Sequence, residues 1–145
     1  MNVAEVANIS IHVAKLLGST AAVITGLSQV SNRRPDTQLI LQGLVTQVQT
    51  LRTALSRIEE LCKVQTSCGQ LGLLEAFQIS LSYCDILVEK LGEDVTTLFA
   101  DANAPVARLM QRLKNTVDSG SVHELQTLLD RQINALNLLL NIYSW

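Results

Sequence analysis

Apolar residues recur every three or four positions through most of this chain, and that spacing predicts long amphipathic helices. The clearest run alternates three- and four-residue steps over three heptads: Leu41, Leu44, Val48, Leu51, Leu55, Ile58 and Cys62. One continuous seam of this kind is typical of helices that pack side by side at a shallow angle. We therefore expect a helix that begins at Pro35 or Asp36 and ends before a loop at residues 66–69.

Two further long helices flank this segment in the sequence. The first covers residues 3–30, and we expect it to be loosened around Gly18. Its bulky apolar side chains fall on one face: Val6, Ile9, Val13, Leu16, Val23, Ile24 and Leu27. The second covers residues 74–91, and Gly92 indicates its end. Its apolar residues have the same three-and-four spacing: Leu74, Phe77, Leu81, Cys84, Val88 and Leu91.

The C-terminal third contains the remaining elements. Residues 92–105 look like an acidic connection with one short turn at residues 95–99, and residues 106–117 form a fourth, shorter helix. Ser121 and Glu124 have the spacing of a capping box, which predicts the start of a fifth helix that carries Leu-rich sequence to the terminus. The expected fold is all-α, an antiparallel bundle of about five helices, four of them long.

Composition supports one helical domain over residues 1–145. Hydrophobic residues make up 48% of the chain and aromatic residues only 3%, so the core is built mainly from Leu, Val, Ile and Ala. Two prolines and seven glycines are too few for the many turns of an all-β sandwich. The last apolar seam continues to Tyr143, and we expect this domain to be the N-terminal piece of a longer, receptor-like protein.

Small residues occupy every fourth position in part of the first helix: Ala14, Gly18, Ala22 and Gly26. A four-residue step keeps side chains on one helical face, so these residues form a smooth groove on the side away from the bulky apolar set. One interpretation is that a neighbouring helix of the same bundle crosses closely there. The other is that the groove serves contact in a membrane or in an oligomer.

Charge is scarce in the same segment. Glu5, His12 and Lys15 are the only ionisable side chains before Arg33. They are either solvent-facing residues of an amphipathic helix or, if the helix enters a bilayer, groups that line a polar path or sit at the headgroups. The uncharged run at residues 16–32 is shorter than the roughly 20 residues that span a bilayer, so we expect no constitutive transmembrane helix.

The charge distribution argues against nucleic-acid binding. The formal net charge is −2, with +2 over residues 33–63 and −5 over residues 64–104. A basic stripe interleaved with aromatic residues is absent from the sequence, so DNA and RNA are not expected partners.

Catalytic and metal-binding patterns are also missing. The pair His123 and Glu124 resembles the start of a zinc-protease motif, but Thr127 stands where the second histidine would be. We expect neither an enzyme nor a metal or cofactor site. The three cysteines, Cys62, Cys68 and Cys84, have no metal-binding spacing, and reduced thiols in an intracellular protein are the expectation.

The order of these elements resembles the fungal HeLo-like domain, the N-terminal helical module of fungal NLR-type (STAND) receptors. The resemblance covers essentially the whole chain. It depends on the apolar first helix, the Leu and Gln seam of residues 44–55, the segment LLEAFQISLSYCDILVEKL and the closing RLMQRLKNTVDSGSVHELQTLLDRQINALNLLL.

This resemblance implies a domain that executes regulated cell death in heterokaryon incompatibility and innate immunity. In such domains clustering releases the N-terminal helix, which inserts into the plasma membrane, and the helix can carry a glycine-zipper-like motif. That motif maps here to Ala14, Gly18, Ala22 and Gly26. The implied partners are further copies of the chain, membrane lipids and a helical signalling domain, and the implied location is the cytoplasm, then the plasma membrane on activation. The alternative is a non-lytic adaptor domain that binds other helical proteins.

Overall fold

Four helices make up the part of the chain that the computed structural model describes, which is residues 3–33, 38–64, 71–100 and 121–143. They are α1 (Val3–Arg33), α2 (Gln38–Val64), α3 (Leu71–Ala100) and α5 (Ser121–Tyr143). These ranges contain no strand, which confirms the all-α prediction. The helix expected at residues 106–117 and the loop at residues 66–69 lie outside the described residues, as do Pro35 and Asp36.

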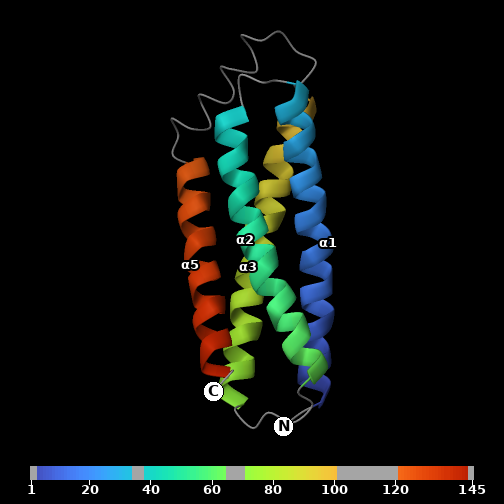
Figure 1. Ribbon diagram of the computed structural model, residues 1–145, viewed down its shortest axis with the longest axis vertical. Helices are drawn as coiled ribbons and strands as arrows, with labels where there is room; N and C mark the ends of the chain where they lie inside the picture. Colours follow the sequence, from blue (N-terminus) through green and yellow to red (C-terminus); the bar gives the residue numbers. More distant parts are fainter. Residues whose placement is uncertain (1–2, 34–37, 65–70, 101–120, 144–145) are drawn as a thin grey trace.

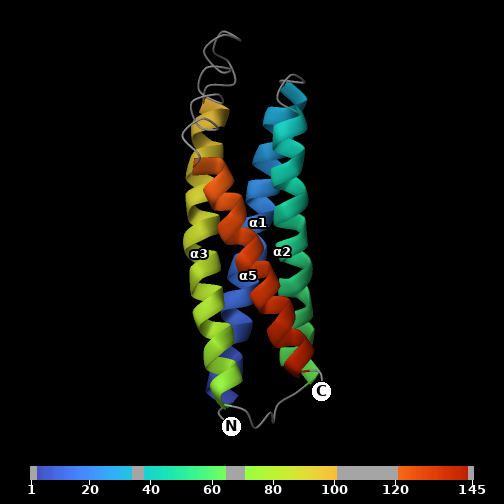
Figure 2. The same ribbon diagram turned by 90° about the vertical axis from the view of Figure 1, so that its left-hand side faces the viewer.

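The helices lie along one common axis with alternating directions (Figure 1). Helices α1 and α3 run one way and α2 and α5 run the other, so the first turn of α1 and the last turn of α5 are at the same end. Helix α1 packs against α2 and α3, and α5 packs against the same two helices from the other side. Figure 2 shows α5 crossing the gap between α3 and α2 obliquely. The arrangement is an antiparallel bundle with one shared core.

Each predicted apolar seam faces that core. Leu41, Leu51 and Leu55 of α2 are completely buried, and so are Leu81 of α3 and Leu136 of α5. Core positions of this kind each contribute about 1.5–3 kcal/mol when they are removed from water, which is the main source of stability in a bundle. The core also includes Ala54, Leu87 and Val30, which extend the seams predicted from the sequence.

Gly92 does not end the third helix, and this prediction was wrong. Helix α3 continues to Ala100, so regular helix replaces the short turn expected at residues 95–99 and the part of the acidic connection up to residue 100; residues 101–105 lie outside the described residues. A glycine inside a helix costs only about 1 kcal/mol relative to alanine. Packing outweighs that cost, because Leu91 is buried and Val23 of α1 approaches to 3.9 Å from the position of a Cβ on Gly92.

The expected loosening of the first helix around Gly18 is also absent. Helix α1 is continuous over 31 residues. Its buried positions follow three- and four-residue steps without a gap, and Thr20 occupies one of them with no exposed surface. The Thr20 hydroxyl donates to the carbonyl oxygens of Leu16 (2.8 Å) and Leu17 (3.1 Å), so a polar group is satisfied inside the core.

Candidate functional site

The small-residue face of α1 points away from the bundle. Ala14, Gly18 and Ala22 are exposed and Gly26 is partly exposed. The bulky apolar set of the same helix is buried on the opposite side, except for Ile24, which is partly buried against the core. The sequence therefore placed both faces of this helix correctly relative to one another.

None of the other three described helices covers this face. A Cβ built on Gly18 meets no atom within 4 Å, whereas a close helix crossing would bring a neighbour into contact there. Within the described part of the bundle, close packing by a neighbouring helix therefore does not explain the small residues at positions 14, 18 and 22. A larger side chain fits at Gly18 without displacing anything.

The rest of the outward face of α1 is also nearly free of charge. Ala7, Ile11, Thr25 and Gln29 lie on it and are exposed, and Ile11 is 68% exposed although it is a large apolar residue. Lys15 is the one exposed ionisable side chain described on this face, between the positions of Ala22 and Gly26 around the helix. Surface helices of soluble bundles ordinarily carry alternating charges here.

By length and composition, α1 is the one described helix that is apolar enough to cross a membrane, over Ala4–Asn32. The 17-residue run counted in the sequence understates this length, because the helix continues through His12 and Lys15. Only 28% of its most apolar 18-residue window is buried in the bundle. The central helix of a soluble core would be mostly buried, so the apolar character of α1 exceeds what its packing requires.

The three polar positions of α1 have different surroundings. Lys15 is exposed and Glu5 is partly buried. His12 is also partly buried, and its ring forms a hydrogen bond with the carboxylate of Asp85 on α3. An ionised carboxylate only accepts hydrogen bonds, so Nε2 of His12 is the donor. The structure thus assigns His12 to an interhelical contact that the sequence did not indicate.

Helix α5 is tied to its neighbours by amide side chains. Nε2 of Gln47 on α2 donates to the backbone oxygen of Gln126 (2.6 Å) and to Oδ1 of Asp130 (2.8 Å). The hydroxyl of Ser80 on α3 donates to Oε1 of Gln132 (2.7 Å). The sequence did not indicate these residues, because a polar residue beside an apolar seam has the same spacing whether it faces solvent or a neighbouring helix.

Two of the cysteines are described, and both are free thiols. Cys84 is fully buried, and burial, followed by the charge of Asp85, raises the pKa of its thiol to about 12. Burial and then the charge of Glu59 raise the pKa of Cys62. Both thiols are therefore protonated and unreactive at neutral pH, in agreement with a structural role. Cys68 lies outside the described residues.

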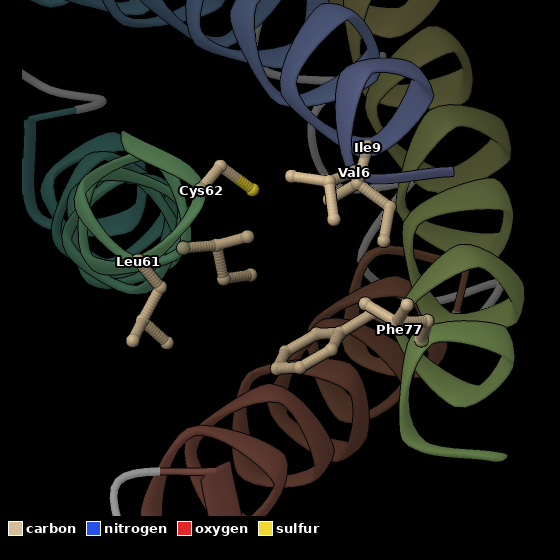
Figure 3. A pocket seen from close by; sticks show the side chains of 7 residues that line it. Val6, Ile9, Leu61, Cys62 and Phe77 are labelled. Carbon is tan, nitrogen blue, oxygen red and sulfur yellow. The ribbon is translucent and has the colours of Figure 1, made fainter. Parts of the chain in front are cut away.

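A small cavity lies between the first turns of α1, the last turns of α2 and the start of α3 (Figure 3). Its volume is about 20 Å³, and its lining is apolar: Val6, Ile9, Ile58, Leu61, Cys62, Leu74 and Phe77. Figure 3 shows the sulfur of Cys62 pointing across it toward Val6 and Ile9. Binding sites for small molecules measure about 300–1,000 Å³, so this cavity is a packing defect with no room for a cofactor.

A wider hollow lies between α2 and α5 and is open to solvent. Gly43, Thr46, Thr50 and Thr127 line it together with the hydrogen-bonded Gln47 and Asp130. Oε1 of Gln47 is buried there without a hydrogen-bond partner. Among the described residues no group of three His, Cys, Asp or Glu side chains could hold a metal ion.

Comparison of the chain with protein-family models, curated proteins and solved structures gives no match.

Proposed function

We propose that this chain is a HeLo-like domain that executes regulated cell death, by clustering and then inserting α1 into the plasma membrane. One observation carries the proposal: the outward face of α1 is open, small and almost uncharged around Ala14, Gly18 and Ala22, while the buried positions of the opposite face are apolar apart from Thr20. A helix with two such faces is suited both to a bundle and to a bilayer. In this proposal the domain acts by assembly and has no enzymatic activity.

The closed bundle keeps α1 inactive. Releasing the helix exposes its apolar seam at a cost of about 1.5–3 kcal/mol for each large apolar side chain. It also breaks the hydrogen bond between His12 and Asp85. Burial of the same side chains among lipid tails offsets the cost, and tethering many copies makes their insertion effectively intramolecular. Clustering is therefore the step that activates the domain.

Leakage from anionic liposomes tests this proposal. The chain is compared as a monomer and as a fusion to a trimeric coiled coil, at equal concentration of the helical domain. We expect release of an encapsulated dye only from liposomes treated with the trimer. Leakage caused equally by monomer and trimer contradicts activation by clustering.

The second candidate is a non-lytic adaptor domain, which is favoured by large apolar residues exposed outside α1. Ile79, Tyr83 and Ile86, which share one face of α3, are each more than half exposed. Scattered apolar residues are ordinary on protein surfaces, but several on one helix face indicate protein contact. Absence of leakage from the trimer, together with binding of another helical domain, would favour the adaptor over the lytic domain.

A further inference from the structure

The outer surface of α3 carries a second, independent seam, which we call the α3 outer seam: Glu75, Ile79, Tyr83, Ile86 and Lys90. Its members are separated by steps of four, four, three and four residues, so they lie on one face of the helix. That face is turned away from the buried seam of the same helix, which includes Leu81, Cys84 and Val88.

The centre of this seam is apolar and open to solvent. Ile79, Tyr83 and Ile86 are 54%, 56% and 63% exposed. Three large side chains next to one another on one helix face form an exposed apolar patch, and such patches are typical of surfaces that contact a partner. Tyrosine is also common at the centre of protein interfaces, because it combines a large apolar ring with a polar tip.

The seam is complementary to itself when it is read in opposite directions. Two copies of α3 can be placed antiparallel, with a two-fold axis between Ser82 and Tyr83. Ile79 of each copy then lies level with Ile86 of the other copy. In the same placement Glu75 of each copy lies level with Lys90 of the other copy, which gives two opposite-charge pairs. A rise of 1.5 Å per residue puts these charge pairs about 11 Å on either side of the centre. Neither Glu75 nor Lys90 forms an ion pair within the described part of the chain.

Charge selects this direction over the parallel one. A parallel pair would set Glu75 against Glu75 and Lys90 against Lys90, and like charges directly opposed are unfavourable. Lys90 is the one cation among the exposed charges described on α3, the others being Glu75, Glu89 and Glu93. We propose that the α3 outer seam binds a second copy of this chain in an antiparallel, two-fold symmetric helix pair.

Such a contact is small. One pair of helices buries less than the roughly 1,200 Å² of a standard interface, so the dimer is weak and forms at high protein concentration or when copies are tethered. The contact does not itself use α1, because every residue of the α3 outer seam belongs to α3. The proposal does not depend on membrane insertion and goes beyond it.

Sedimentation equilibrium of the chain in solution, without lipid, measures this association. We expect a monomer–dimer equilibrium that Ile86→Asp weakens by at least about tenfold, because a carboxylate would be desolvated at the contact. The matched control is Leu138→Asp, an equally exposed apolar residue on α5. A chain that remains monomeric at its solubility limit overturns the proposal, and so does equal loss of association in both variants.

Charge reversal tests the antiparallel register. Glu75→Lys and Lys90→Glu each replace two attractive pairs with two repulsive ones, and we expect each to weaken the dimer by about tenfold. The double variant restores opposite charges at both ends, so its dissociation constant returns close to the original value. Glu60→Lys, at an exposed site on α2, is the control for net charge. Failure of the double variant to recover association overturns the register.

Cross-linking detects the contact even when it is weak. In a chain with Cys62→Ser and Cys68→Ser, a cysteine introduced by Ser82→Cys lies beside the two-fold axis, and we expect oxidation to give a disulfide-linked dimer. Gln49→Cys on α2, which is also exposed, serves as the control and is expected to stay monomeric. Equal cross-linking of the two variants would show random collision and contradict the proposed surface. None of these experiments includes a membrane, so they give the same answer whether or not α1 inserts.

Discussion

His12 of α1 is hydrogen-bonded to Asp85 of α3, a residue 73 positions further along the chain. Both side chains are partly buried, with 23% and 30% of their surface exposed. The contact joins the helix that we propose is released to a helix that we propose stays in the bundle. It is therefore a direct way to test how firmly α1 is held.

His12→Ala and Asp85→Ala should each lower the free energy of unfolding by about 1–2 kcal/mol, because each leaves a partly buried polar partner unpaired. The double variant should lose less than the sum of the two losses. Urea denaturation of the three variants measures this coupling. Glu89→Ala, an exposed carboxylate one turn along α3, is the control. Strictly additive losses would mean that the two side chains do not interact in solution.

Gly18→Leu should leave the bundle folded and abolish leakage by the trimeric fusion. The site has room for a side chain, and leucine is a better helix former than glycine by up to about 1 kcal/mol, so stability should be unchanged or higher. The groove, however, would be filled. Gly43→Leu on α2 is a close control, because Gly43 is also exposed with no atom within 4 Å of its Cβ position. Full leakage by Gly18→Leu would exclude the groove from the mechanism.

Thr20→Val should raise the free energy of unfolding by about 1 kcal/mol, since valine has nearly the same shape and removes a buried hydroxyl. The carbonyl oxygens of Leu16 and Leu17 still accept the backbone hydrogen bonds of the helix, so the substitution leaves no acceptor without a donor. Thr25→Val is the control, because the Thr25 hydroxyl makes the same kind of bond, 3.0 Å to the oxygen of Ala21, at an exposed position. Thermal unfolding of both variants provides the comparison. Destabilisation by Thr20→Val alone would show that the hydroxyl has a partner outside its own helix.

Stability should fall in alkali because of Cys84. Its thiol has a pKa of about 12 in the folded chain, against an ordinary value of 9.0. The folded state therefore holds the thiol proton more tightly than the unfolded state. The contribution of the protonated thiol to the free energy of unfolding is complete below pH 9 and is lost as the pH rises toward 12. A shift of this size corresponds to as much as about 4 kcal/mol over that range. Cys84→Ala should have a flatter stability curve above pH 9 by urea denaturation. Parallel curves for the two proteins would contradict the effect of burial on this thiol.

The apolar seams were predictable because the residues on the buried face of a helix recur with the helical period. All six predicted seam residues of α3 and six of the seven of α2 are buried, and Cys62 at the end of α2 is partly buried. The extent of α3 was not predictable from Gly92, because a local helix breaker competes with packing against Val23, which comes from 69 positions earlier in the chain.

The sequence by itself determined that α1 has two uncharged faces, since the positions of residues around a helix depend only on the helical period. It could not decide what either face contacts. Tertiary structure decided that the bulky face is buried, that Ala14, Gly18 and Ala22 are left open by the described helices, and that His12 meets Asp85. The physical reason is that helical periodicity depends on residues close together in the sequence. Exposure and pairing depend on which helices, distant in the sequence, pack beside each face.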